Sequence, residues 1–111
     1  MKLDELVFLE DIKNAIKEIE QFVEAYDFQQ FIVNRPSQLI AERLLIVIGE
    51  AAVKIKRSKP DLLTHVDKMI GLRNRVVHDY ATIDHATVFV ILKDHIPLLK
   101  KEVQELLRVH G

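Results

Sequence analysis

The residue types best suited to chemistry in this sequence are concentrated in one short segment, residues 71–80. Within eight positions it holds two arginines, an amide, a histidine, a carboxylate and a phenol: Arg73, Asn74, Arg75, His78, Asp79 and Tyr80. A histidine can move a proton as a general acid or base, and an arginine stays positively charged and stabilises negative charge on a phosphate. The segment therefore indicates acid-base chemistry at a phosphate group.

Arginine and histidine together are the groups that metal-free cleavage of RNA requires. RNA has its own nucleophile in the 2′-hydroxyl, so His78 would remove or relay that proton. Arg73 would stabilise the added charge of a phosphorane-like transition state, and DNA, which lacks the hydroxyl, would not be cut. The same pattern also fits a simpler arrangement, a histidine at a helix C-terminus beside surface arginines.

The spacing of these residues decides whether they can act together. Asn74 and His78 are four residues apart and would share one face of a helix. Arg73 and His78 are five apart and would be offset by about 140° around the helix axis. They would meet at one phosphate only if the arginine reaches round the helix, the helix end is distorted, or a second copy of the chain completes the site.

Apolar residues spaced three and four apart predict an all-α fold. We expect helices at about residues 4–26, 36–56, 60–78 and 84–108, with a break around residues 28–35. Pro36 and Pro60 mark two helix starts, Asp84 is a plausible N-cap, and Pro97 should kink the last helix near residues 93–94. Four helices with short connections predict an antiparallel four-helix bundle formed by a single domain, residues 1–111.

Two runs of five apolar residues, 44–48 and 88–92, wrap more than one face of a helix. One explanation is a central helix that the other helices surround. The explanation we favour is the buried surface of a homodimer, because symmetric dimers are the commonest oligomers.

Composition excludes several classes of protein. The 111 residues include no cysteine, which excludes disulfides, and 16 basic against 17 acidic residues leave a formal net charge of −1. Such a balance gives no strong overall attraction for nucleic acid or anionic membranes. The histidines lack metal-binding spacing and there is no glycine-rich phosphate loop, so we expect neither a metal nor a cofactor. With no membrane-spanning stretch and no basic leader, we expect a cytoplasmic protein.

The segment Arg73-Asn74-Arg75-x-x-His78-x-Tyr80 closely resembles the HepT-like branch of the HEPN superfamily, as does the Ile48-Gly49-Glu50-Ala51 stretch on the second expected helix. The likeness covers nearly the whole chain. It implies a small helical bundle that dimerises, with the Arg-x4-His motif as a composite ribonuclease site. It also implies a toxin of a type VII toxin-antitoxin module. The antitoxin would be a MntA-like minimal nucleotidyltransferase that transfers AMP from ATP to Tyr80.

The resemblance assigns a role to each matching residue. Arg73 and His78 would be catalytic, and Asn74 would hold His78 or a phosphate oxygen. Arg75 and the basic run at residues 54–59 would bind the RNA backbone, although that run equally fits a solvated helix end. Glu50, a carboxylate inside an apolar helix, would be buried and would need a partner. It would be a supporting residue paired with Arg73 or Arg75, or part of a purely structural ion pair.

Tyr80 has three possible roles: the AMPylated residue, a wall that stacks or orients a base, or a half-buried tyrosine at the end of the bundle. An AMP group there would place a bulky, negatively charged phosphate two residues from His78, where it would repel RNA.

Three functions fit these residues. The one we favour is a dimeric, metal-independent endoribonuclease toxin that is silenced by AMPylation of Tyr80. The second is a non-catalytic RNA- or nucleotide-binding accessory subunit of a minimal nucleotidyltransferase. The third is a dimeric scaffold whose polar helix end is only a cap.

Overall fold

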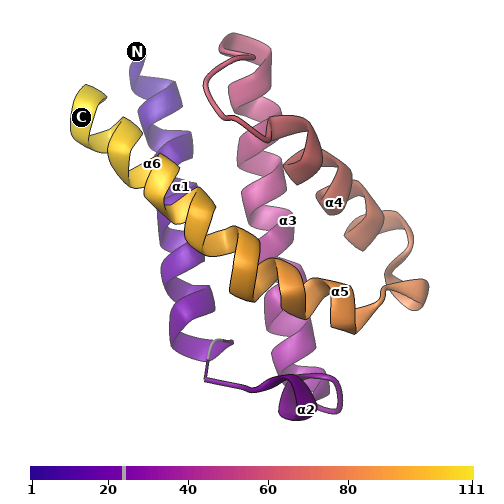
Figure 1. The fold of residues 1–111 in the computed structure, drawn as a ribbon. Helices are drawn as coiled ribbons and strands as arrows, with labels where there is room; N and C mark the ends of the chain where they lie inside the picture. Colours follow the sequence, from indigo (N-terminus) through magenta and orange to yellow (C-terminus); the bar gives the residue numbers. More distant parts are fainter. Residues whose placement is uncertain (24) are drawn as a thin grey trace.

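The computed structural model describes residues 1–23 and 25–111, and Figure 1 shows them as a set of packed helices. The elements are α1 (Leu3–Phe22), α2 (Phe28–Phe31), α3 (Arg35–Ser58), α4 (Val66–His78), the 3-10 turn η1 (Tyr80–Thr82), α5 (His85–Val90), the π turn η2 (Ile91–His95) and α6 (Ile96–His110). No β-strand occurs in either described range, so the prediction of an all-α fold is confirmed. None of the helices described is long and apolar enough to cross a membrane.

Helices α1 and α3 lie side by side, and α4 packs against the C-terminal half of α3 (Figure 1). Elements α5, η2 and α6 follow one another as a single long, bent rod that crosses in front of α1. The core is formed by apolar side chains from α1, α3 and this rod: Leu9, Ile12, Ile16, Ile19, Leu45, Ile48, Ala52, Ile55, Leu92, Ile96 and Val103. The two apolar runs of the sequence therefore lie at the centre of the molecule.

Burial within one chain corrects the reading of these runs as a dimer surface. In the first run Leu44, Leu45 and Ile48 are buried, and in the second run Val88 and Leu92 are buried. The one clearly exposed residue of either run is Val90, with 47% of its surface accessible. Packing against the other helices of the same chain therefore explains most of both apolar runs. The two runs do not by themselves require a second chain.

The second long helix begins and ends close to the predicted positions. Helix α3 starts at Arg35, one residue before Pro36, because the Asn34 side chain caps it by accepting a hydrogen bond from the Ser37 N–H at 2.8 Å. Asp84 caps α5 as expected, accepting from the Ala86 N–H at 3.0 Å and the Thr87 hydroxyl at 2.8 Å.

The predicted kink before Pro97 is confirmed. Pro97 is the second residue of α6, and the π turn Ile91–His95 directly precedes that helix. Proline lacks an N–H and its ring crowds the carbonyl four residues earlier, which belongs to Lys93. A locally widened turn accommodates both effects.

The prediction that the third helix starts at Pro60 is wrong. Helix α4 begins only at Val66, and residues 60–65 form a loop. Leu63 is buried in the core, and Thr64 donates to the Glu102 carboxylate of α6 from its N–H at 3.1 Å and also from its hydroxyl. These contacts with distant residues outweigh the local helix-start signal of the proline.

The expected break at residues 28–35 contains a short helix, α2. Asp27 caps it by accepting from the Gln30 N–H at 2.8 Å, and the Gln30 side chain accepts from the Asp27 N–H at 3.0 Å. The ring of Phe31 is fully buried and lies 5.6 Å from that of Phe89. This aromatic contact attaches α2 to α5.

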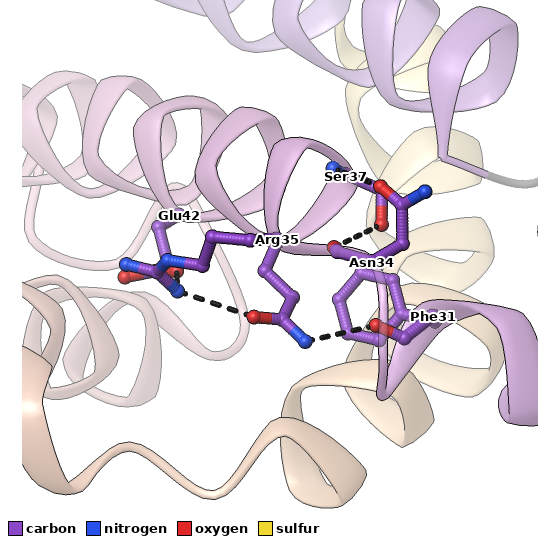
Figure 2. Close-up of polar contacts among 6 residues, drawn as sticks. Phe31, Asn34, Arg35, Ser37 and Glu42 are labelled. Carbon is purple, nitrogen blue, oxygen red and sulfur yellow. Dashed lines mark hydrogen bonds and ion pairs between the residues drawn. The ribbon is translucent and has the colours of Figure 1, made fainter.

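A polar cluster joins the end of α2 to the first turns of α3, as Figure 2 shows. Arg35 Nη1 donates to the Glu42 carboxylate at 2.9 Å and to the Gln38 side-chain oxygen at 3.2 Å. Gln38 Nε2 donates in turn to the Phe31 carbonyl at 2.9 Å. The buried Glu42 and Gln38 thus have polar partners, as buried polar groups require.

Candidate active site

Arg73 lies midway along α4, on the side of that helix that faces α3. A Cβ atom built on Gly49 of α3 would overlap the Arg73 Cβ and would lie 2.6 Å from its Cγ. The stem of the arginine therefore rests against the α3 backbone, and 25% of the side chain is exposed.

The head of Arg73 pairs with Glu50, the residue after Gly49. Arg73 Nη2 lies 2.8 Å from Glu50 Oε1, and Nε lies 3.2 Å from the same oxygen. This hydrogen-bonded guanidinium holds the pKa of the Glu50 carboxyl below its usual value. Of the two partners predicted for Glu50, the structure selects Arg73. The carboxylate is nevertheless 47% exposed, so the expectation of a buried Glu50 is wrong.

Asn74 contacts Arg73, its neighbour in sequence. Its Oδ1 accepts a hydrogen bond from Arg73 Nη1 at 2.7 Å. An arginine has five N–H donors, and Glu50 and Asn74 together engage three of them. Two N–H groups remain for a ligand. Neither described range contains a hydrogen bond between Asn74 and His78, so Asn74 supports the arginine here rather than the histidine.

His78 is the last residue of α4 and is exposed. Among the residues described, its ring makes no hydrogen bond or ion pair, and so neither kind of contact joins it to the Arg73 guanidinium. The helix is regular to its end, since the Asp79 N–H donates to the Arg75 carbonyl at 2.8 Å. A distorted helix end, one of the three routes by which the two side chains could meet, is therefore excluded.

The remaining geometry separates Arg73 and His78 within one chain. Five residues of helix place them roughly 7.5 Å apart along the axis and about 140° apart around it. Because Glu50 holds the Arg73 head toward α3, the arginine does not reach round to His78. Of the three routes, completion of the site by a second copy is the one that this geometry leaves open.

Tyr80 begins the 3-10 turn that follows α4, and 65% of its surface is exposed. The turn is closed by the Thr82 N–H, which donates to the Asp79 carbonyl at 2.9 Å. This exposure excludes one of the three possible roles of Tyr80, that of a half-buried tyrosine at the end of the bundle. The phenol is accessible both to a modifying enzyme and to a base.

The basic run at residues 54–59 lies away from His78. Lys56 Nζ is 2.5 Å from the Asp67 carboxylate, which belongs to the first turn of α4, and Lys54 Nζ lies 5.4 Å from the centre of the Phe8 ring. Asp67 and His78 are eleven helical residues apart, or roughly 16 Å. Arg75, by contrast, is exposed near His78 and has no ion pair in the part of the chain described.

Among residues 1–23 and 25–111, no three histidine, cysteine, aspartate or glutamate side chains lie close enough together to hold a metal ion. No role was predicted for Gly49, although it lies in the Ile48-Gly49-Glu50-Ala51 stretch, because its role depends on how α3 and α4 cross. The signal was available: a glycine inside an apolar helix usually marks a packing constraint.

The all-helical fold and the Arg-x4-His segment at the exposed end of a helix are consistent with the HEPN class of proteins. The family model described as "Ribonuclease HepT-like" matches residues 12–106. The chain belongs to this HepT-like ribonuclease family.

Curated relatives support the same family. The chain is 32% identical over 110 residues to the "Probable ribonuclease HepT" of Thermococcus cleftensis, covering 96% of this chain and 98% of that protein. It is also 32% identical over 109 residues to the "Putative RNase MJ0125" of Methanocaldococcus jannaschii, covering 96% of this chain and 94% of that protein. No solved structure matches the chain significantly.

Proposed function

We propose that this protein is a metal-independent endoribonuclease, the toxin of a toxin-antitoxin module, and that it acts as a homodimer of antiparallel four-helix bundles. Membership of the HepT-like ribonuclease family supports the activity. The observation that most favours it is the contrast between two groups of α4. Arg73 is fixed by Glu50 and Asn74 with two N–H donors left over, while His78 is exposed and unpaired among the residues described.

The proposed reaction uses the nucleophile that RNA supplies. His78 removes the proton of the 2′-hydroxyl, and the 2′-oxygen attacks the adjacent phosphorus. The bond from phosphorus to the 5′-oxygen breaks, the 5′-oxygen takes up a proton, and a 2′,3′-cyclic phosphate remains. The free N–H groups of Arg73 stabilise the charge that develops on the phosphoryl oxygens.

A second protomer would bring the two groups together. The separation of Arg73 and His78 around α4 places them on different sides of one helix. In a two-fold dimer that pairs the α4 ends, Arg73 of one protomer would face His78 of the other, and the two-fold axis would make two equivalent sites.

Tyr80 is the proposed site of control by a MntA-like nucleotidyltransferase antitoxin. Its exposed phenol lies two residues after His78. An AMP group there would add negative charge and bulk beside the histidine, so an RNA phosphate would be repelled and its access to His78 blocked.

The alternative is a non-catalytic subunit that binds RNA or a nucleotide for a nucleotidyltransferase. The separation of Arg73 from His78 in one chain favours this alternative, because phosphate binding needs the arginine alone. A subunit of this kind would hold RNA without cutting it.

Cleavage assays with purified protein in EDTA separate the two functions. We expect RNA to be cut and to carry 2′,3′-cyclic phosphate ends, and we expect His78→Ala and Arg73→Ala to abolish cutting. His110→Ala, at the exposed end of α6, is the matched control and should cut normally. Loss of activity in EDTA, or normal cutting by His78→Ala, would contradict the proposed roles. Tight RNA binding by the unmodified protein without any cleavage would establish the accessory subunit instead.

A further inference from the structure

The two glycines inside helices have opposite surroundings. Gly49 lies in α3 and Gly71 in α4. A Cβ added at Gly71 would meet no atom within 4 Å, whereas one added at Gly49 would overlap Arg73 and approach the Met69 carbonyl oxygen to 3.2 Å. Glycine is a poor helix former, so its presence at position 49 needs a reason, and close packing against Arg73 supplies one.

The atoms that a Cβ at position 49 would meet leave little room for adjustment. The Arg73 Cβ is fixed by the α4 backbone, so a change of side-chain rotamer cannot move it away. An alanine at position 49 would therefore push α4 and α3 apart at this point. The guanidinium would move with the helix, away from Glu50.

We propose that Gly49 is a positioning residue for Arg73: its missing side chain lets the arginine stem rest on α3, so that the next residue, Glu50, can hold the guanidinium. This inference rests on the proposed function for its catalytic consequence, but its structural part stands on the helix contact alone. Position 49 receives the stem and position 50 receives the head.

The arrangement also fixes which side of the guanidinium meets a phosphate. Glu50 occupies the edge formed by Nε and Nη2, and Asn74 accepts one Nη1 hydrogen. The two remaining N–H groups are one on Nη1 and one on Nη2. A ligand phosphate must approach these two, so a displacement of the guanidinium would change where the phosphate binds.

The first test compares Gly49→Ala with Gly71→Ala, which makes the same change where space is open. For Gly49→Ala we expect kcat/KM for RNA to fall about 100-fold, the typical cost of a displacement near 1 Å. Gly71→Ala should leave it unchanged. The Arg73 Nε–Hε NMR signal, assigned by its loss in Arg73→Lys, should shift in Gly49→Ala and in Glu50→Gln but not in Gly71→Ala. An unchanged Nε–Hε signal in Gly49→Ala would overturn the inference, whatever the activity.

The second test covers the case in which Gly49→Ala folds poorly. Placing the glycine on the opposite helix, in Gly49→Ala/Arg73→Gly, removes the overlapping Cβ while keeping the alanine. In the natural background, we expect Gly49→Ala to lower the melting temperature. In the Arg73→Gly background, we expect the same substitution to leave the melting temperature unchanged or to raise it. An equal drop in both backgrounds would place the clash elsewhere and refute the contact.

The two tests separate the possible failures. If the unaltered protein cuts no RNA, the proposed function fails, while the NMR signal and the melting temperatures still decide the role of Gly49. If the protein cuts RNA and Gly49→Ala cuts equally well with an unshifted signal, the proposed function stands and the positioning role fails.

Discussion

Arg73 of α4 and Glu50 of α3 form an ion pair across the helix interface, with Nη2 and Nε of the arginine 2.8 Å and 3.2 Å from one carboxylate oxygen. Both side chains are partly exposed, and ion pairs of this kind contribute little to stability because water screens them. The pair does, however, restrict a long and flexible side chain to one position. Its main consequence is therefore the orientation of the guanidinium.

The first prediction concerns the pH dependence of stability. Arg73 lowers the pKa of Glu50 in the folded protein, so the folded state binds this proton less readily than the unfolded state. The stabilisation is present above the ordinary carboxyl pKa and is lost as the pH falls through the lowered value. We expect Glu50→Gln to lose less free energy of unfolding than the natural protein on acidification from about pH 6 to about pH 3, by an amount under about 1 kcal/mol.

Urea denaturation followed by circular dichroism measures this difference. Glu18→Gln, on an exposed side of α1, is the control and should follow the natural protein. If Glu50→Gln and the natural protein lose the same free energy of unfolding on acidification, the ion pair between Glu50 and Arg73 does not contribute to stability.

The second prediction concerns the binding of the RNA backbone. Arg75 is exposed on α4 near His78, whereas Lys56 already pairs with Asp67 at the other end of that helix. In a His78→Ala background that prevents cleavage, we expect Arg75→Ala to weaken RNA binding and to reduce the slope of log affinity against log salt by about 1. Lys56→Ala should change the slope less, and Arg75→Lys should preserve it. Fluorescence anisotropy of a labelled RNA over a KCl series tests this, and equal slopes for the two alanine variants would contradict it.

The third prediction concerns modification. The sequence has two tyrosines, and Tyr80 is the exposed one beside the candidate site. After incubation with a MntA-like nucleotidyltransferase and ATP, we expect the mass of AMP on Tyr80 and a loss of RNA cleavage. Tyr26→Phe should still be modified, and Tyr80→Phe should not. Mass spectrometry of the intact protein and of its peptides measures this, and labelling that persists in Tyr80→Phe would exclude Tyr80 as the site.

The sequence predicts the features that depend on neighbouring residues. The cap at Asp84 and the kink before Pro97 follow from local hydrogen bonding and local sterics, and both are present. The start of α4 could not be predicted because Thr64 bonds to Glu102, 38 residues away.

The candidate site shows the same division. The face shared by Asn74 and His78 follows from helical spacing, but the partner of Asn74 is Arg73, which no spacing rule selects. The role of Gly49 depends on how two helices cross, which only the folded chain reveals. The sequence shows the positive charge of residues 54–59, but the distance of these residues from His78 depends on the direction in which α4 runs.

The last prediction tests whether Arg73 and His78 of different protomers share a site. Arg73→Ala and His78→Ala should each be inactive, but a mixed dimer would have one site with both residues altered and one with both intact. Because purification through both tags selects the mixed dimers, and one of the two sites in each mixed dimer is intact, about half of the natural activity per dimer should return. Co-expression of the two variants with different tags, purification through both tags and the RNA assay measure this recovery. Each variant mixed with itself should stay inactive. Doubly tagged dimers that cut no RNA would show that the two residues do not act across a dimer interface.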